Sequence, residues 1–321
     1  MSNILSVDNL HVAFHTPEGR LPAVRGIGFD LERGKALGLV GESGCGKTVT
    51  ALSLMRLVPP PGRIESGTIT LFGRDLIGLE DRRMRKIRGK EMAMIFQEPM
   101  SSLNPVFTIA DQIMEAIRVH ERVGTGEARE RTIRLLRDVE IPDPARRRED
   151  YPHQLSGGQR QRVMIAMAIA CNPAVLLADE PTTALDVTVQ ARILALLTRL
   201  REKRKMAPLL VTHDLGVVAQ ETDRVAVMYL GRIVESALTG ELFNNPLHPY
   251  TRALLRSIPR PGEGKERLET IPGVVPDLNR IPRGCSFHPR CPLAEEVCRR
   301  EVPINREIRP GHRVECHLAG R

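Results

Sequence analysis

Short apolar runs alternate with longer helical patterns along most of this chain. Apolar positions recur through residues 4–14 and predict a strand, and residues 36–40 predict a short buried strand that leads directly into a glycine-rich loop. Further strands are predicted at residues 68–72, 92–96, 175–178, 209–212, 225–228 and 232–235. Strands that alternate with helices favour a mainly parallel sheet, in which ligands bind at the carboxyl ends of the strands.

Helical patterns fill the spaces between these strands. One helix is predicted at residues 48–57, and the prolines at 59–61 are expected to end it. Others are predicted at residues 109–120, 128–139 and 187–203. Two of them lie in one long helical stretch, so we predict that a helical subdomain of about residues 98–160 is inserted into the α/β pattern.

The composition changes after about residue 240. Prolines become frequent there, and four of the six cysteines fall between residues 285 and 316. We therefore predict an α/β domain at residues 1–240 and a small cysteine-rich C-terminal extension at residues 241–321.

A phosphate-binding loop is the first motif that carries chemistry. Residues 41–48 fit the pattern G-x4-G-K-[ST], in which the glycines let successive backbone N–H groups point at phosphates. Lys47 is expected to reach the β- and γ-phosphates, and the Thr48 hydroxyl to bind Mg²⁺. The nucleotide-binding residues predicted in this loop are Gly41, Ser43, Gly44, Cys45, Gly46, Lys47 and Thr48. The Cys45 thiol predicts that thiol-modifying reagents would disturb nucleotide binding.

Two carboxylates follow the buried strand at 175–178. Beside a phosphate loop, Asp179 is expected to hold Mg²⁺ through its water shell, and Glu180 to polarise the attacking water as general base. The alternative is that the two carboxylates only cap the strand end.

A second glycine-containing motif precedes an apolar helix. Its sequence is Leu155-Ser156-Gly157-Gly158-Gln159, termed here the signature segment. Ser156 can cap the helix, and the glycine N–H groups at the helix end form an anion site.

The signature segment and the phosphate loop together resemble the ATP-binding-cassette (ABC) ATPases. The resemblance implies a P-loop NTPase cassette: a RecA-like core, an N-terminal antiparallel β part and an inserted helical subdomain. It implies that Ser156, Gly157, Gly158 and Gln159 bind ATP held by a second subunit. It also implies roles for Gln97, which contacts Mg²⁺ or water, and for the switch histidine His213.

Two further assignments come from the same resemblance. Phe14 matches the aromatic residue that stacks on adenine, although Phe14 could simply be a core residue. Residues 184–186 match the D-loop, which crosses the dimer interface in this family.

Longer phrases narrow the resemblance to the oligopeptide/dipeptide/nickel importer ATPases, nearest to the dipeptide permease branch. They are QEPMSSLNP at 97–105, PTTALDVTVQ at 181–190 and NPLHPYT at 245–251. The resemblance implies import of di- or oligopeptides by a complex with a second, different ATPase (a heterodimer). The other parts are two membrane permease subunits and a periplasmic or extracellular substrate-binding protein. Nickel, haem and glutathione are alternative cargoes.

The C-terminal cysteines predict a metal site. Cys285, Cys291, Cys298 and Cys316 lie in a chain that reads as cytosolic, where structural disulfides are disfavoured. The C-x2-C pairs typical of zinc are absent. The same family resemblance implies a [4Fe–4S] cluster. Zinc, or reduced thiols without metal, remain alternatives.

Charge and composition limit the remaining possibilities. The formal net charge of +8 fits either a solvated basic surface or attraction to an anionic membrane or membrane partner. No apolar run is long enough to span a bilayer, and no signal peptide is visible, so we expect a peripheral protein on the cytoplasmic face of the inner membrane. Aromatic residues make up 3 % of the chain, which disfavours nucleic-acid stacking.

Two other classes of function stay open at this point. One is a single-cassette ATPase that acts on nucleic acid. The other is a nucleotide switch controlled by the cysteine site.

Overall fold

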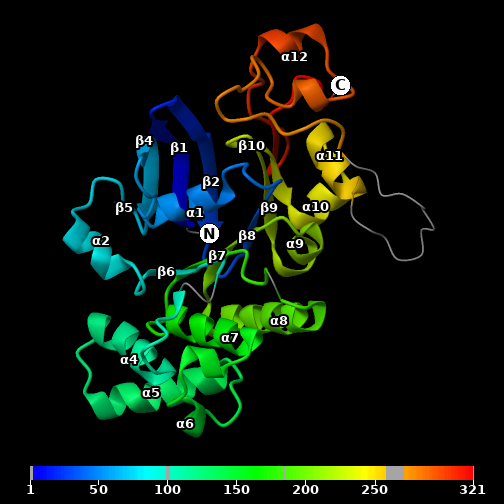
Figure 1. The fold of residues 1–321 in the computed structure, drawn as a ribbon. Helices are drawn as coiled ribbons and strands as arrows, with labels where there is room; N and C mark the ends of the chain where they lie inside the picture. The colour runs from blue at the N-terminus through cyan, green and yellow to red at the C-terminus, as the bar shows by residue number, and fades with distance from the viewer. Residues whose placement is uncertain (1–2, 99–101, 184, 258–270, 321) are drawn as a thin grey trace. The chain divides into compact units, whose positions relative to one another are not determined.

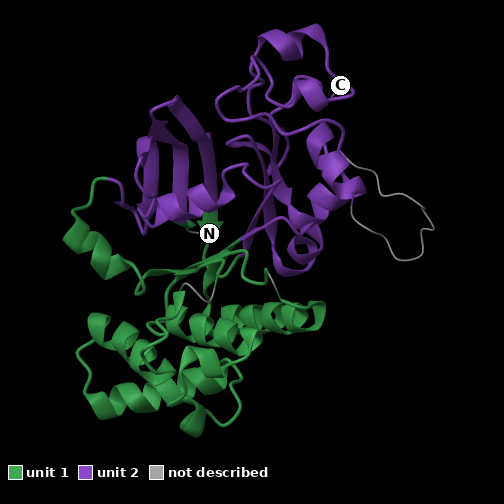
Figure 2. Ribbon diagram, in the orientation of Figure 1, with its two compact units in different colours: residues 1–4, 31–35, 78–210 green, residues 5–30, 36–77, 211–321 purple. Residues whose placement is uncertain are grey.

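The computed structural model describes residues 3–98, 102–183, 185–257 and 271–320. The chain divides into two compact units (Figure 2). Unit 1 comprises residues 1–4, 31–35 and 78–210, and unit 2 comprises residues 5–30, 36–77 and 211–321. The phosphate loop and the cysteine-rich extension therefore belong to the same unit. The predicted boundary near residue 240 stays a prediction.

An antiparallel sheet forms the N-terminal part of unit 2 (Figure 1). Its strand order is β2-β1-β4-β5, with β1 at Asn3–Thr16, β2 at Gly19–Glu32, β4 at Gly62–Leu71 and β5 at Arg74–Asp75. β1 turns Leu5, Val7 and Leu10 into the core, as its apolar pattern predicts. β2 was not predicted, because Pro22 and several glycines weaken the strand pattern there.

A second sheet in unit 2 carries the phosphate loop. β3 (Leu37–Val40) pairs in parallel with β9 (Arg224–Tyr229), and β9 pairs antiparallel with β10 (Arg232–Leu238). The C-terminal strands β11 (Arg306–Arg309) and β12 (His312–Val314) continue this sheet, because β12 pairs with β10 and β11 with β12. The end of the chain is thus hydrogen-bonded into the sheet that leads to the phosphate loop.

Short helices complete unit 2. They are α1 (Lys47–Leu54), α9 (Leu215–Glu221), α10 (Thr239–Asn244), α11 (Pro249–Arg256), the 3-10 turn η2 (His288–Arg290) and α12 (Glu296–Arg300). α1 ends three residues earlier than predicted. Arg56 adopts a left-handed conformation (φ 51°), and Leu57 N–H donates to the Leu52 carbonyl, so the chain turns before it reaches the prolines.

An aromatic cluster joins the C-terminal extension to the rest of this core. The rings of Tyr229, Tyr250 and Phe287 lie with their centres 4.7–5.3 Å apart, in tilted or edge-on contacts. They belong to one buried group with Val40, the last residue of β3. On β10, the buried carboxylate of Glu235 accepts hydrogen bonds from the backbone N–H groups of Leu247 and His248. His312 Nε2 from β12 lies 2.7 Å from the same carboxylate.

Unit 1 contains the helical subdomain. The elements of unit 1 are α2 (Asp81–Ile87), β6 (Met92–Ile95), α4 (Ile109–His120), α5 (Thr125–Asp138), α6 (Pro144–Arg147), the 3-10 turn η1 (Pro152–Gln154), α7 (Gly157–Ala168), β7 (Val175–Asp179) and α8 (Val187–Arg204). β6 and β7 pair in parallel, and α4, α5 and α7 pack against one another. β8 (Ala207–Thr212) crosses the boundary between the units. Among the described residues, no helix is both long and apolar enough to cross a membrane.

Candidate functional site

The phosphate loop of unit 2 lies tightly against backbone from two other strands. A Cβ atom on Gly41 would lie 2.1 Å from the Met228 carbonyl oxygen, and one on Gly46 would lie 2.4 Å from the Ala23 carbonyl oxygen. Gly46 also has a φ of 106°, which favours glycine. Only glycine fits at these two positions, so the backbone can wrap closely enough to present its N–H groups.

Lys47 is held inside the loop rather than extended from it. Its ammonium group donates to the carbonyls of Gly41 (2.7 Å) and Glu42 (3.1 Å), and the residue is 5 % exposed. Ser43, Gly44 and Thr48, by contrast, are exposed at the surface of the loop. The predicted phosphate-facing groups thus surround a lysine whose charge is already positioned by the loop backbone.

The Cys45 thiol is enclosed by the loop. Cys45 is 1 % exposed, and burial raises the pKa of its thiol despite the nearby Lys47 ammonium. Both features disfavour an accessible thiolate in this loop conformation, and sensitivity to thiol reagents stays a prediction.

Unit 1 brings two of the predicted catalytic residues together. Gln97 Nε2 donates to the Glu180 carboxylate (3.3 Å), and the Thr183 hydroxyl donates to the same oxygen (2.8 Å). Asp179 ends β7 and is 2 % exposed. Glu180 has a φ of 45°, an unfavourable conformation for a residue with a side chain. Strain of this kind is typical of residues whose position serves a function.

The signature segment has the predicted cap. Ser156 Oγ accepts a hydrogen bond from Gln159 N–H (3.3 Å), and Gln159 Oε1 accepts one from Ser156 N–H (3.0 Å). This reciprocal capping box starts α7 at Gly157 and leaves the glycine N–H groups at the positive end of the helix. The local geometry is therefore suited to an anion.

The signature segment packs against the start of α8. A Cβ on Gly157 would meet the Leu185 side chain at 3.7 Å, whereas one on Gly158 would meet Val189 Cγ1 at 2.8 Å. Asp186 caps α8 by accepting a hydrogen bond from Val189 N–H (2.9 Å). The predicted D-loop residues Leu185 and Asp186 thus lie beside the signature segment, and Ala184 lies outside the described residues.

The two remaining predicted nucleotide-site residues lie in unit 2. His213 is exposed directly after β8, and the neighbouring Asp214 caps α9. The Phe14 ring packs on Gly62, where a Cβ would lie 2.7 Å from Phe14 Cε1. Phe14 is half-buried, so its role as an adenine contact stays a prediction.

The four C-terminal cysteines are free thiols. The pKa of the Cys285 thiol is raised to about 11, mainly by burial and in part by the other three cysteines. Cys285 N–H donates to the Cys298 carbonyl (2.9 Å), and this hydrogen bond connects the two ends of the segment 285–298. Among the described residues, no three His, Cys, Asp or Glu side chains are gathered closely enough to hold a single metal ion.

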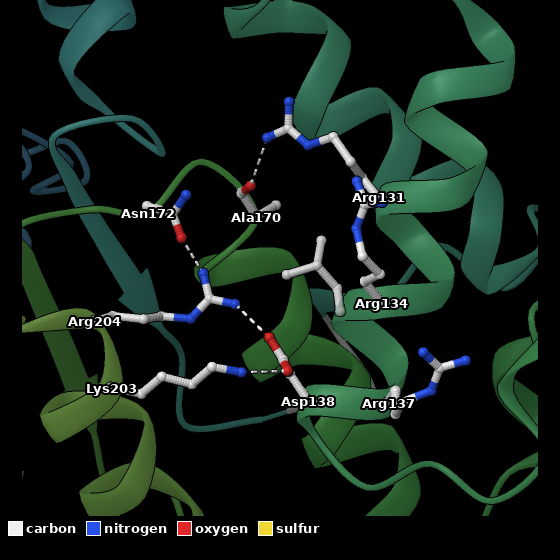
Figure 3. A pocket seen from close by; sticks show the side chains of 9 residues that line it. Arg131, Arg134, Arg137, Asp138, Ala170, Asn172, Lys203 and Arg204 are labelled. Carbon is white, nitrogen blue, oxygen red and sulfur yellow. Dashed lines mark hydrogen bonds and ion pairs between the residues drawn. The ribbon is translucent and has the colours of Figure 1, made fainter.

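A cavity of about 360 Å³ in unit 1 is lined by charged side chains (Figure 3). Asp138 accepts hydrogen bonds there from Lys203 (2.8 Å) and Arg204 (2.7 Å). Burial opposes ionisation of Asp138, but the hydrogen bonds and the positive charges of Lys203 and Arg204 together lower its pKa. Arg131 donates to the Ala170 carbonyl, and Arg137 points away from Asp138. The cations do not converge on one point. The cavity is therefore a place where charged side chains connect α5, α8 and the end of α7.

Sequence reasoning missed two residues that hold the phosphate loop. The Tyr250 hydroxyl accepts a hydrogen bond from Glu42 N–H (3.0 Å), and Arg290 donates two hydrogen bonds to the Glu42 carboxylate. The partners are 208 and 248 positions apart along the chain, so no local pattern could connect them. The one available signal was an arginine beside Cys291 in a segment already singled out for its cysteines.

Comparisons with known proteins agree with these motifs. The family described as "ABC transporter" matches residues 24–183, and the "Oligopeptide/dipeptide transporter, C-terminal region" matches residues 234–298. The dipeptide transport ATP-binding protein DppD of Escherichia coli is 48 % identical to this chain, over 98 % of the chain and 96 % of that protein. The protein of the same name from Haemophilus influenzae is 50 % identical, over 98 % and 95 %.

The chain belongs to the ABC transporter family. ABC cassettes bind and hydrolyse ATP, and the chain is an ATPase of this type. Solved structures agree on the fold. A bacterial ABC transporter cassette described as dimeric has a TM-score of 0.66 and 27 % identity, and covers 73 % of this chain and 98 % of its own. The same cassette bound to ADP and Pi after hydrolysis matches equally well.

The packing of Gly158 generates a prediction for this ABC ATPase. Gly158→Ala would push its new methyl group into the stiff Val189 side chain, so we expect a loss of about 1–2 kcal/mol in the free energy of unfolding. Gly157→Ala is the matched control, because its methyl group has ordinary contact distance and improves helix propensity. Urea unfolding measures both. Equal effects of the two substitutions would contradict the predicted contact.

Proposed function

We propose that this ABC ATPase powers the import of di- or oligopeptides across the cytoplasmic membrane. The observation that carries the proposal is the C-terminal match at residues 234–298, because the cassette itself is common to transporters of many cargoes. Its relatives named as dipeptide transport ATP-binding proteins align with nearly the whole chain. The extension is also paired into the sheet of the phosphate loop, which supports a role in the working ATPase.

The proposed hydrolysis uses the residues placed above. The phosphate loop and Lys47 bind the β- and γ-phosphates. Thr48 and Gln97 supply oxygen atoms, the ligand type that Mg²⁺ prefers, and Asp179 holds Mg²⁺ through its water shell. Mg²⁺ would neutralise charge on the phosphates as the bond to the leaving group breaks.

Glu180 acts as general base on the attacking water in this proposal. Its contacts with Gln97 and Thr183 fix the direction of its carboxylate. His213 contacts the γ-phosphate and holds the same water. The role of each of these residues is taken from the family motif that it matches.

The signature segment supports a dimer. Ser156, Gly157, Gly158 and Gln159 form an anion site at a helix end, and in the proposal it closes over ATP held by a second, homologous ATPase. We propose a heterodimer that docks on two membrane permease subunits, with a substrate-binding protein on the outer side. The ATPase would then be peripheral to the inner membrane, on its cytoplasmic face, and would not need nucleic acid.

We further propose that Cys285, Cys291, Cys298 and Cys316 hold a [4Fe–4S] cluster. Four partly or fully buried thiols that act on one another's pKa fit such a group. Zinc bound by the same four thiols is the alternative. Because ATP hydrolysis needs no electron, the proposed role of the cluster is structural. Its bonds to the four cysteines would cross-link the extension.

The assignment of Glu180 is tested by Glu180→Gln. We expect the variant to bind ATP normally but to hydrolyse it about 10²- to 10⁴-fold more slowly, because the water loses its general base. ATP turnover and equilibrium ATP binding are measured on the same preparation. Glu202→Gln, an exposed change on α8, is the control and should leave turnover unchanged. Normal hydrolysis by Glu180→Gln would show that another group is the base.

The cargo is tested in a strain that lacks this ATPase. We expect the strain to lose growth on dipeptides as sole nitrogen source, while free amino acids support normal growth and nickel-dependent activities are unchanged. Growth restored by the wild-type chain but not by Glu180→Gln would tie the loss to ATP hydrolysis. Loss of nickel-dependent activities with normal growth on dipeptides would instead assign the chain to nickel import. Stimulation of ATP turnover by DNA would instead favour a single-cassette ATPase that acts on nucleic acid.

The cluster is tested by anaerobic purification. We expect a brown protein with about four iron atoms and four acid-labile sulfides per chain. Cys298→Ser should lose most of this iron, whereas Cys171→Ser, outside the extension, should retain it. Stoichiometric zinc without iron, or no metal after anaerobic purification, would reject the cluster.

A further inference from the structure

Arg290 is a buried cation in the middle of the cysteine-containing part of the extension. It ends the turn η2, directly before Cys291, and its side chain is 3 % exposed. A buried guanidinium requires several partners to offset the loss of water. Its Nε donates to the Pro272 carbonyl (3.0 Å), and its guanidinium lies about 6 Å from the ring centres of Tyr229 and Phe287.

The remaining donors of Arg290 face the phosphate loop. Nη1 donates to Glu42 Oε2 (2.7 Å), and Nη2 donates to Glu42 Oε1 (3.0 Å). Such a two-pronged pair is among the strongest and most directional contacts between side chains. The hydrogen bonds to Glu42 also raise the pKa of Arg290, so the cation is always charged.

Glu42 is the second residue of the phosphate loop and is held twice by the extension. Its carboxylate pairs with Arg290, and its backbone N–H donates to the Tyr250 hydroxyl (3.0 Å). Its carbonyl accepts a hydrogen bond from Lys47 (3.1 Å). A continuous series of contacts therefore runs from the cysteine segment through Glu42 to the lysine that binds phosphate.

We propose that Arg290 is a positioning residue for the phosphate loop and thereby sets the affinity for ATP. A loop with three glycines has many accessible conformations, and binding has to select one of them. The extension restricts that choice by holding Glu42 on one side of the loop. Pre-organisation of this kind raises affinity without any direct contact to the nucleotide. The inference rests on ATP binding by the phosphate loop and is independent of the cargo and of the metal.

The first test replaces Arg290 with alanine in the full chain. We expect Arg290→Ala to raise the Kd for a fluorescent ATP analogue, and the KM for ATP, by about tenfold or more. The kcat at saturating ATP should stay near that of the wild type, because Glu180 and the residues that orient it, Gln97 and Thr183, belong to unit 1. Arg290→Lys keeps the charge but loses the two-pronged contact, so an intermediate Kd is expected.

The matched control is Arg300→Ala in the same extension. Arg300 pairs with Glu296 on α12, and both side chains are largely exposed, so its loss should leave the Kd unchanged. Thermal unfolding of every variant separates a local effect from loss of the fold. Wild-type affinity in a folded Arg290→Ala variant would overturn the proposal.

The second test places the effect on Glu42. Glu42→Gln removes the charge and one of the two acceptors from the loop side, so it should also raise the Kd while the extension keeps its sequence. Adding Arg290→Ala to Glu42→Gln should then change the Kd little further, because both substitutions disrupt the same contact between Arg290 and Glu42. Additive effects of the two substitutions would overturn the proposal.

Glu42→Gln also decides the case if Arg290→Ala fails to fold. A raised Kd with an unchanged unfolding temperature would support the proposal, and an unchanged Kd would overturn it. Absence of ATP binding by the wild-type chain would count against the proposed function instead.

Discussion

The close approach of the phosphate loop to the backbone of unit 2 is the constraint on which the rest of that unit depends. Gly41 and Gly46 lie so near the carbonyls of Met228 and Ala23 that no side chain fits between them. The loop therefore cannot be placed by its own sequence alone. It needs β9 on one side and β2 on the other, and both strands have to be fixed before the loop acquires its shape.

The same constraint explains how the end of the chain affects the beginning. β9 is fixed by its pairing with β3 and β10, and β10 pairs in turn with β12. Glu235 on β10 is buried with three polar partners, one of them His312 from β12. Removal of β12 would leave this carboxylate without one partner in a water-poor environment, which is strongly destabilising. The extension is thus structurally continuous with the sheet that supports the loop.

Local chemistry decided which parts of the site could be predicted from the sequence. The capping box at Ser156 depends on residues within a few positions of one another, so its pattern was visible and the structure contains it. The glycine pattern of the phosphate loop was visible too, although its shape also depends on β2 and β9. β2 was missed because its support comes from pairing with β1 rather than from its own residues. The Arg290–Glu42 contact was invisible because its partners are 248 positions apart. The burial of the Cys45 thiol was invisible for a related reason, since it depends on the surrounding fold.

The distribution of charge adds a final distinction between the two units. In unit 1, arginines and lysines largely pair with nearby carboxylates across helix contacts, as Arg204 does with Asp138 and Arg162 with Glu140. Such partly exposed pairs fasten helices to one another and contribute modestly to stability. In unit 2, Arg290 is almost fully buried and is directed at a loop that binds ligand. A buried two-pronged pair is costly to break and highly directional, so it is better suited to fixing the position of a loop than to adding general stability.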